Sequence, residues 1–114
     1  MITFQKLFND IKTWQDKTFG NYDNPFPSYR HMEKEFKELE DALIKGSPDD
    51  TNEEFADNFM LLIGMYIRQK RAEGKSCTYY DLLHAINGKF KINKNRNWSE
   101  PDEDGVMYHI KESC

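Results

Sequence analysis

The sequence predicts an all-α protein with a four-helix core and an extended C-terminal tail. Apolar residues recur at spacings of three and four in four segments, which is the helical period. Short stretches rich in Gly, Pro, Asn and Asp separate these segments, and none shows the alternation typical of a β-strand. We expect a single domain over residues 1–114, with helices at about 3–18, 28–45, 51–73 and 78–94 and a tail at 95–114.

The first two helices have clear boundaries. Thr3 is placed to cap the first helix, and its apolar stripe comprises Phe4, Leu7, Phe8, Ile11 and Trp14. The segment GNYDNPFPS then ends the helix, because Gly, Asn and Pro favour loops. The second helix starts near Ser28 and carries Met32, Phe36, Leu39 and Leu43 on one face.

The third and fourth helices also carry end signals. Gly74 follows the third helix, where glycine is favourable, and Asp81 lies three residues after Thr78, as in a capping box. The third helix is apolar around so much of its circumference that three neighbours in a chain of this size cannot cover it. We therefore expect a homo-oligomer, a dimer or a tetramer, to complete the bundle.

Composition excludes several classes of function. The formal net charge is −4, whereas a general nucleic-acid or membrane-surface binder needs a basic excess. We expect no signal peptide and no membrane-spanning segment, and hence a cytoplasmic protein. Cys77 and Cys114 lack metal-ligand spacing and are expected to be free thiols. The three histidines are scattered, so we expect them to have packing or surface roles.

Two acidic motifs carry the chemical information. Glu35 and Glu38 lie at i, i+3 in the second expected helix, and Glu54 and Asp57 have the same spacing in the third. Each pair therefore projects from one helix face. If the two helices pack together, up to four carboxylates converge, and their repulsion favours a bound divalent cation. Mg²⁺ is the usual ion where carboxylates meet phosphates.

Each acidic residue also has a simpler explanation. Glu35 and Glu38 fit an ordinary solvated helix face, since MEKEFKELED is charged almost throughout. Glu54 fits a capping box with Thr51. Asp57 is harder to dismiss, because we expect it to be buried within the apolar segment FADNFMLLIGMY, where an unpaired charge is costly.

A basic set follows in the fourth helix. Lys89, Asn93 and Arg96 are spaced at i, i+4 and i+7, so they share one face as the helix ends. Lys and Arg suit phosphate oxygens. The alternative is that cations gather there because a helix C-terminus favours them.

In this order, the motifs resemble those of the all-α MazG-type nucleoside triphosphate pyrophosphohydrolases. That family has E-x-x-E on one helix, E-x-x-D on the next and K-x-x-x-N-x-x-R downstream. The chain is most similar to the dATP/dGTP pyrophosphohydrolase subgroup, often found in phages, in which case the host cytoplasm is the expected location. This similarity extends to the segments WQDKTF and RNWSEPDEDGVMYHI and so covers nearly the whole chain.

The resemblance implies hydrolysis of a deoxynucleoside triphosphate, dATP or dGTP, to the monophosphate and pyrophosphate. It implies two or three Mg²⁺ ions, replaceable by Mn²⁺, and water attack at the α-phosphorus. By this resemblance the metal ligands are Glu35, Glu38, Glu54 and Asp57, and the catalytic base is Glu38 or Glu35. The resemblance also implies that phosphate is bound by Lys89, Asn93 and Arg96. The residues implied to contact base or sugar are Trp14, Gln15 and Phe19. The alternatives are a non-catalytic nucleotide sensor and a helical protein-interaction module.

Overall fold

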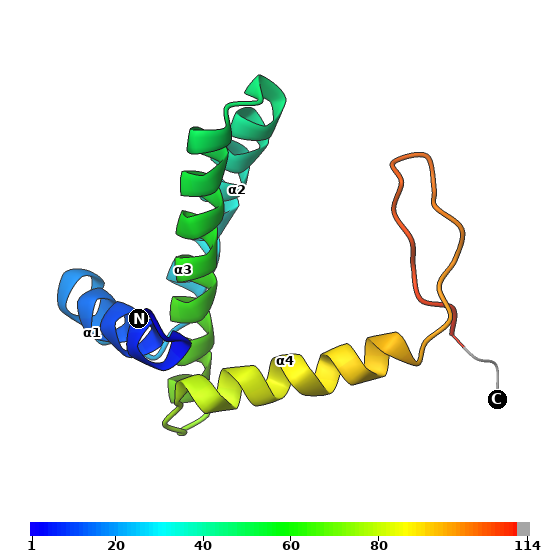
Figure 1. Cartoon of the computed structure of the whole chain (residues 1–114). Coiled ribbons are helices and arrows are strands. Elements are labelled where there is room, and N and C mark those ends of the chain that lie inside the picture. The colour runs from blue at the N-terminus through cyan, green and yellow to red at the C-terminus, as the bar shows by residue number, and fades with distance from the viewer. Residues whose placement is uncertain (112–114) are drawn as a thin grey trace. The chain divides into compact units, whose positions relative to one another are not determined.

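The computed structural model describes residues 1–111, and its regular structure over that range is helical. The four helices are α1 (Phe4–Phe19), α2 (Phe26–Lys45), α3 (Pro48–Ala72) and α4 (Tyr79–Lys94) (Figure 1). The all-α prediction is therefore confirmed. Cys114 lies outside the described residues, whereas Cys77 is a buried free thiol.

Local sequence signals explain most helix ends. The Thr3 hydroxyl accepts a hydrogen bond from the Lys6 backbone N–H, which caps α1 as expected. At the end of α3, Gly74 has a φ of +75°, a left-handed conformation that glycine adopts without strain. The Asp81 carboxylate accepts a hydrogen bond from the Thr78 backbone N–H at the start of α4.

The start of α3 corrects one expectation. The helix begins at Pro48, three residues before Thr51, and the N-cap is Ser47. The physical reason is that Ser-Pro-Asp-Asp is itself a strong start signal: a Ser cap, Pro at the first position and two acids near the positive end of the helix dipole. Thr51 therefore lies inside the helix and bonds back to the Ser47 carbonyl. The capping-box explanation for Glu54 was wrong.

The chain divides into two compact units, Met1–Leu82 and Leu83–Cys114. In the first unit, α2 packs along α3, and α1 packs on α3 as well. Its core comprises Phe8, Ile11, Ile63, Ile67 and Cys77, and the partly buried Tyr79 and Leu82 pack against it.

The second unit contains the rest of α4 and a loop that turns back on itself. Trp98 and His109 form an isolated antiparallel bridge, and the Ser99 N–H donates to the Tyr108 carbonyl at 2.7 Å. The segment expected to be an extended tail is thus a hairpin-like loop where it is described. Within α4, none of the side chains is buried.

Candidate active site

Three of the four predicted carboxylates meet where α2 packs on α3. One carboxylate oxygen from each of Glu35, Glu38 and Glu54 lies within 4.8 Å of the other two. Glu35 and Glu54 are half-buried, whereas Glu38 is exposed. The i, i+3 spacing places Glu35 and Glu38 on the α2 face that looks towards Glu54, as the motif predicted.

The electrostatics of these three groups are unfavourable in the absence of a cation. Burial, followed by the hydrogen bond and the negative charge of Glu38, raises the pKa of Glu35 above its ordinary value. Burial, followed by the charges of Glu38 and Asp57, also raises the pKa of Glu54. One oxygen each of Glu35 and Glu54 is buried without a hydrogen-bond partner in the described part of the chain. Clustered, unpartnered carboxylate oxygens fit a hard divalent cation such as Mg²⁺.

Asp57 differs from what the sequence indicated. Its side chain is exposed, because the buried position on this turn of α3 belongs to the next residue, Asn58, which is 6% exposed. The expectation of a buried Asp57 was wrong. Asp57 is not one of the three clustered carboxylates, although its charge acts on both Glu35 and Glu54.

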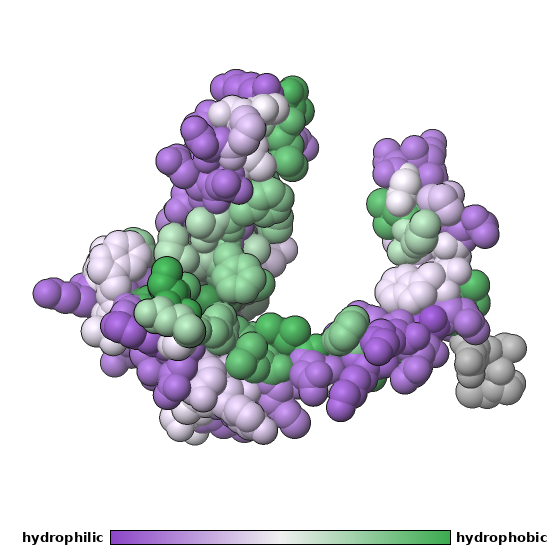
Figure 2. Space-filling view, in the orientation of Figure 1, coloured by the Kyte–Doolittle hydropathy of each residue, from purple (hydrophilic) through white to green (hydrophobic). Residues whose placement is uncertain are grey.

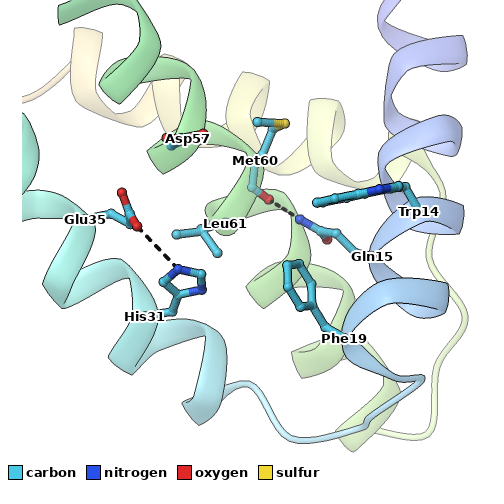
Figure 3. A pocket seen from close by; sticks show the side chains of 8 residues that line it. All are labelled: Trp14, Gln15, Phe19, His31, Glu35, Asp57, Met60 and Leu61. Atoms are coloured by element: carbon cyan, nitrogen blue, oxygen red, sulfur yellow. Dashed lines mark hydrogen bonds and ion pairs between the residues drawn. The ribbon is translucent and has the colours of Figure 1, made fainter. Parts of the chain in front are cut away.

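A pocket of about 140 Å³ opens beside the acidic cluster. Its lining comes from α1, α2 and α3: Trp14, Gln15, Phe19, His31, Glu35, Asp57, Met60 and Leu61 (Figure 3). The three residues expected to contact base or sugar, Trp14, Gln15 and Phe19, therefore lie together in one wall. Most of the lining is aromatic or apolar, and the carboxylates are at one end.

Neighbouring side chains hold the pocket wall in place. The rings of Trp14 and Phe19 meet edge to face, as do those of Phe19 and His31. Gln15 is 3% exposed and donates from Nε2 to the Met60 carbonyl at 2.9 Å, a bond drawn in Figure 3. The wall is thus tied to α3 by a buried amide.

His31 lines the pocket beside Glu35, a position that the sequence did not reveal. Its Nε2 lies 3.3 Å from Glu35 Oε1, one helical turn away on α2 (Figure 3). The i, i+4 spacing of His31 and Glu35 was the available signal. A lone histidine at that spacing is so common that it carries little information without the pocket.

A second pocket of about 300 Å³ lies on the other side of the cluster. It is lined by Glu38 and Glu54 together with Asp41, Ala42, Lys45 and Asp50. The acidic cluster therefore lies between an aromatic pocket and a polar one. Four of the six residues that line the second pocket are acidic, so it favours cations and repels a phosphate group that carries no metal ion.

The predicted basic residues belong to the second unit. Lys89 is exposed on α4, while Asn93 and Arg96 are half-buried near the end of that helix. The Asn93 carbonyl accepts hydrogen bonds from the Arg96 backbone N–H and from Trp98 Nε1. Their proposed contact with phosphate stays a prediction.

No described helix is both long and apolar enough to cross a membrane.

Comparison with known proteins identifies the family to which the chain belongs. No curated protein and no solved structure gives a significant match to the chain. A sequence model of the dATP/dGTP pyrophosphohydrolase family, however, matches residues 7–114, nearly the full length. The chain therefore belongs to the dATP/dGTP pyrophosphohydrolase family, and it is a MazG-like nucleoside triphosphate pyrophosphohydrolase.

Proposed function

We propose that this enzyme hydrolyses dATP or dGTP to the nucleoside monophosphate and pyrophosphate in a Mg²⁺-dependent reaction. The observation that carries the proposal is the group of Glu35, Glu38 and Glu54, whose oxygens lie within 4.8 Å of one another beside an aromatic pocket. Glu35, Glu38 and Glu54 would hold Mg²⁺ or Mn²⁺, and the ion would supply positive charge for the triphosphate and a lowered pKa for a water molecule. Two or three ions per site are expected, with Asp57 as a further ligand from the pocket side.

The aromatic pocket is the proposed base site. Its volume of about 140 Å³ is below the roughly 300–1,000 Å³ of pockets that enclose a complete small molecule. It therefore suits the base alone, held against Trp14 and Phe19 by stacking, with Gln15 and the sugar nearby. The triphosphate of the bound deoxynucleotide then passes Glu35 where the substrate leaves the pocket.

The remaining roles follow from exposure and charge. Glu38 is the most exposed of the three clustered carboxylates, so a water molecule reaches it most readily. We assign it the role of accepting the proton of the water that attacks the α-phosphorus, and Glu35, which His31 holds, is the second candidate. Lys89, Asn93 and Arg96 are proposed to bind the β- and γ-phosphates, where charge grows as pyrophosphate leaves.

We also propose that the enzyme is a homo-oligomer, a dimer or a tetramer. Apolar side chains reach the surface of the first unit (Figure 2). Two apolar grooves of about 380 and 310 Å³ share Tyr29, Leu62 and Met65 in their walls. Exposed apolar surface of this kind marks interaction sites. Phe59 is half-exposed and suits such a contact, whereas Ile63, one turn later on α3, is 2% exposed and belongs to the core of the chain itself.

The function is tested with all canonical NTPs and dNTPs, each assayed with Mg²⁺, with Mn²⁺ and with EDTA. We expect release of intact pyrophosphate from dATP or dGTP in either metal and none in EDTA. In heavy-oxygen water the label should enter the monophosphate. Label in pyrophosphate, or release of free phosphate and a diphosphate, would contradict attack at the α-phosphorus.

A further inference from the structure

Asn58 is a buried polar residue placed between the two helices that carry the acidic cluster. Its side chain is 6% exposed, although it lies on α3 next to the exposed Asp57. Its amide nitrogen donates two hydrogen bonds. One goes to the Glu54 carbonyl on the same helix at 2.8 Å, and the other goes to the Glu35 carbonyl on α2 at 3.3 Å.

These two carbonyls belong to residues that supply clustered carboxylates. The backbone of Glu35 and that of Glu54 are therefore joined through one amide group. The origin of each carboxylate side chain is fixed relative to the other by this connection. Because metal ligands must be held to within a fraction of an ångström, a link at this point affects how well the oxygens converge.

Burial of the amide oxygen of Asn58 lowers the stability of the fold. This oxygen is buried and finds no donor among residues 1–111. A leucine of similar size would pack between α2 and α3 without leaving a polar atom unsatisfied. Packing alone thus gives no reason for asparagine at this position, whereas its two N–H donors give a specific one.

We infer that Asn58 is a positioning residue that sets the spacing of the Glu35 and Glu54 carboxylates for the divalent cation. The inference rests on the metal site of the proposed function. Asn58 itself does not need to touch the substrate. Its effect is on the affinity of the cluster for the cation.

The test measures Mn²⁺ binding to the nucleotide-free protein by electron paramagnetic resonance. Asn58→Leu removes both donors and keeps the volume. Asn58→Ser is the second variant, because a serine hydroxyl can bond to the carbonyl four residues earlier but is too short to reach α2. We expect the Mn²⁺ dissociation constant to rise about 10- to 100-fold in both variants, the usual effect of losing a group that orients metal ligands.

A matched control separates positioning from general loosening of the fold. Ile67 is 3% exposed in the core and outside the acidic cluster, so Ile67→Ala lowers thermal stability without touching the site. Its Mn²⁺ affinity should stay within about twofold of the parent. If Asn58→Leu does not fold, Asn58→Ser decides the question.

Three results would overturn the inference. Parent-like Mn²⁺ affinity in both Asn58 variants would show that the amide only packs. An equal loss of affinity in Ile67→Ala would show that any weakening of the fold has the same effect. Failure of the parent itself to bind Mn²⁺ would instead contradict the proposed metal site. This result is distinguishable from the first two, because it appears before any Asn58 variant is compared.

Discussion

Glu35→Gln should stabilise the metal-free protein, because Glu35 is crowded by like charges. Its carboxylate has oxygens of Glu38 and Glu54 within 4.8 Å, and its side chain is only 17% exposed. Burial and Glu38 raise its pKa, and the pairing with His31 offsets this only in part. Removing the charge relieves the repulsion that a bound cation would otherwise neutralise.

The size of the effect follows from Coulomb's law. Two unit charges 4.8 Å apart repel by about 3.5 kcal/mol at an effective dielectric constant of about 20, and by about 0.9 kcal/mol in bulk water. Glu38 is exposed, which moves its repulsion of Glu35 towards the lower figure. Loss of the ion pair between His31 and Glu35 costs less than about 1 kcal/mol. We expect Glu35→Gln to raise the free energy of unfolding by about 1 kcal/mol at neutral pH.

The pH dependence has a definite sign. Because the folded-state pKa of Glu35 lies above the ordinary value of 4.5, the folded parent binds this proton more tightly than the unfolded chain does. The parent therefore loses stability as pH rises from about 4.5 through the folded-state pKa. The difference in the free energy of unfolding between Glu35→Gln and the parent should be absent below that pH range and complete above it.

Urea denaturation followed by circular dichroism, in EDTA and at several pH values, measures this difference. Glu40→Gln is the matched control, because it removes one charge from the same helix outside the cluster. Added Mg²⁺ should stabilise the parent more than Glu35→Gln. Equal stability of parent and Glu35→Gln in EDTA at neutral pH, or an equal gain in Glu40→Gln, would refute the reasoning.

Three further predictions concern the surroundings of the site. A Cβ added at Gly64 would lie 2.5 Å from the side-chain oxygen of Gln15, which is 3% exposed and would have to give up its hydrogen bond to Met60 to move away. Gly64→Ala should therefore lower the free energy of unfolding by about 1–3 kcal/mol in denaturant titrations, and unchanged stability would contradict this. Arg71 binds both Asp16 oxygens at 2.7 and 2.9 Å and lowers the Asp16 pKa below 3.8. Asp16→Asn should therefore cost about 1–2 kcal/mol at neutral pH, a difference that disappears as pH falls through the lowered pKa. Lys89→Ala should lower kcat/KM by a factor that corresponds to about 2–4 kcal/mol of lost transition-state stabilisation. Parent-like kinetics would mean that the basic residues are only a charged helix end.

The fold was predictable from sequence because helical signals are local. The stripe containing Phe8 and Ile11, the Thr3 cap and the glycine at position 74 each act within one or two turns. The start of α3 was misplaced because Thr51 and Ser47 offer competing caps, and only Ser47 is followed by proline.

The candidate site was predictable only in part, because it depends on contacts between helices. The i, i+3 motifs indicated which faces carry Glu35, Glu38 and Glu54, and these do meet. Burial could not be inferred for Asp57 and Asn58, because adjacent residues on a helix differ by about 100° in direction and the packing partner decides which is covered. His31 lacked a distinctive pattern for another reason: a histidine four residues before a glutamate is common on helices, and only the pocket gives it significance.

The most direct test of the central claim compares two adjacent glutamates. Glu54 lies in the acidic cluster, whereas its neighbour Glu53 is exposed and is not one of the clustered carboxylates. Pyrophosphate release from dATP and dGTP is measured with Mg²⁺ for Glu54→Gln and Glu53→Gln, which lose the same charge one residue apart. We predict that Glu54→Gln loses at least about a hundredfold in turnover while remaining folded, and that Glu53→Gln keeps the parent rate. Parent-like turnover in Glu54→Gln would contradict the assignment of this cluster as the site of metal-dependent hydrolysis.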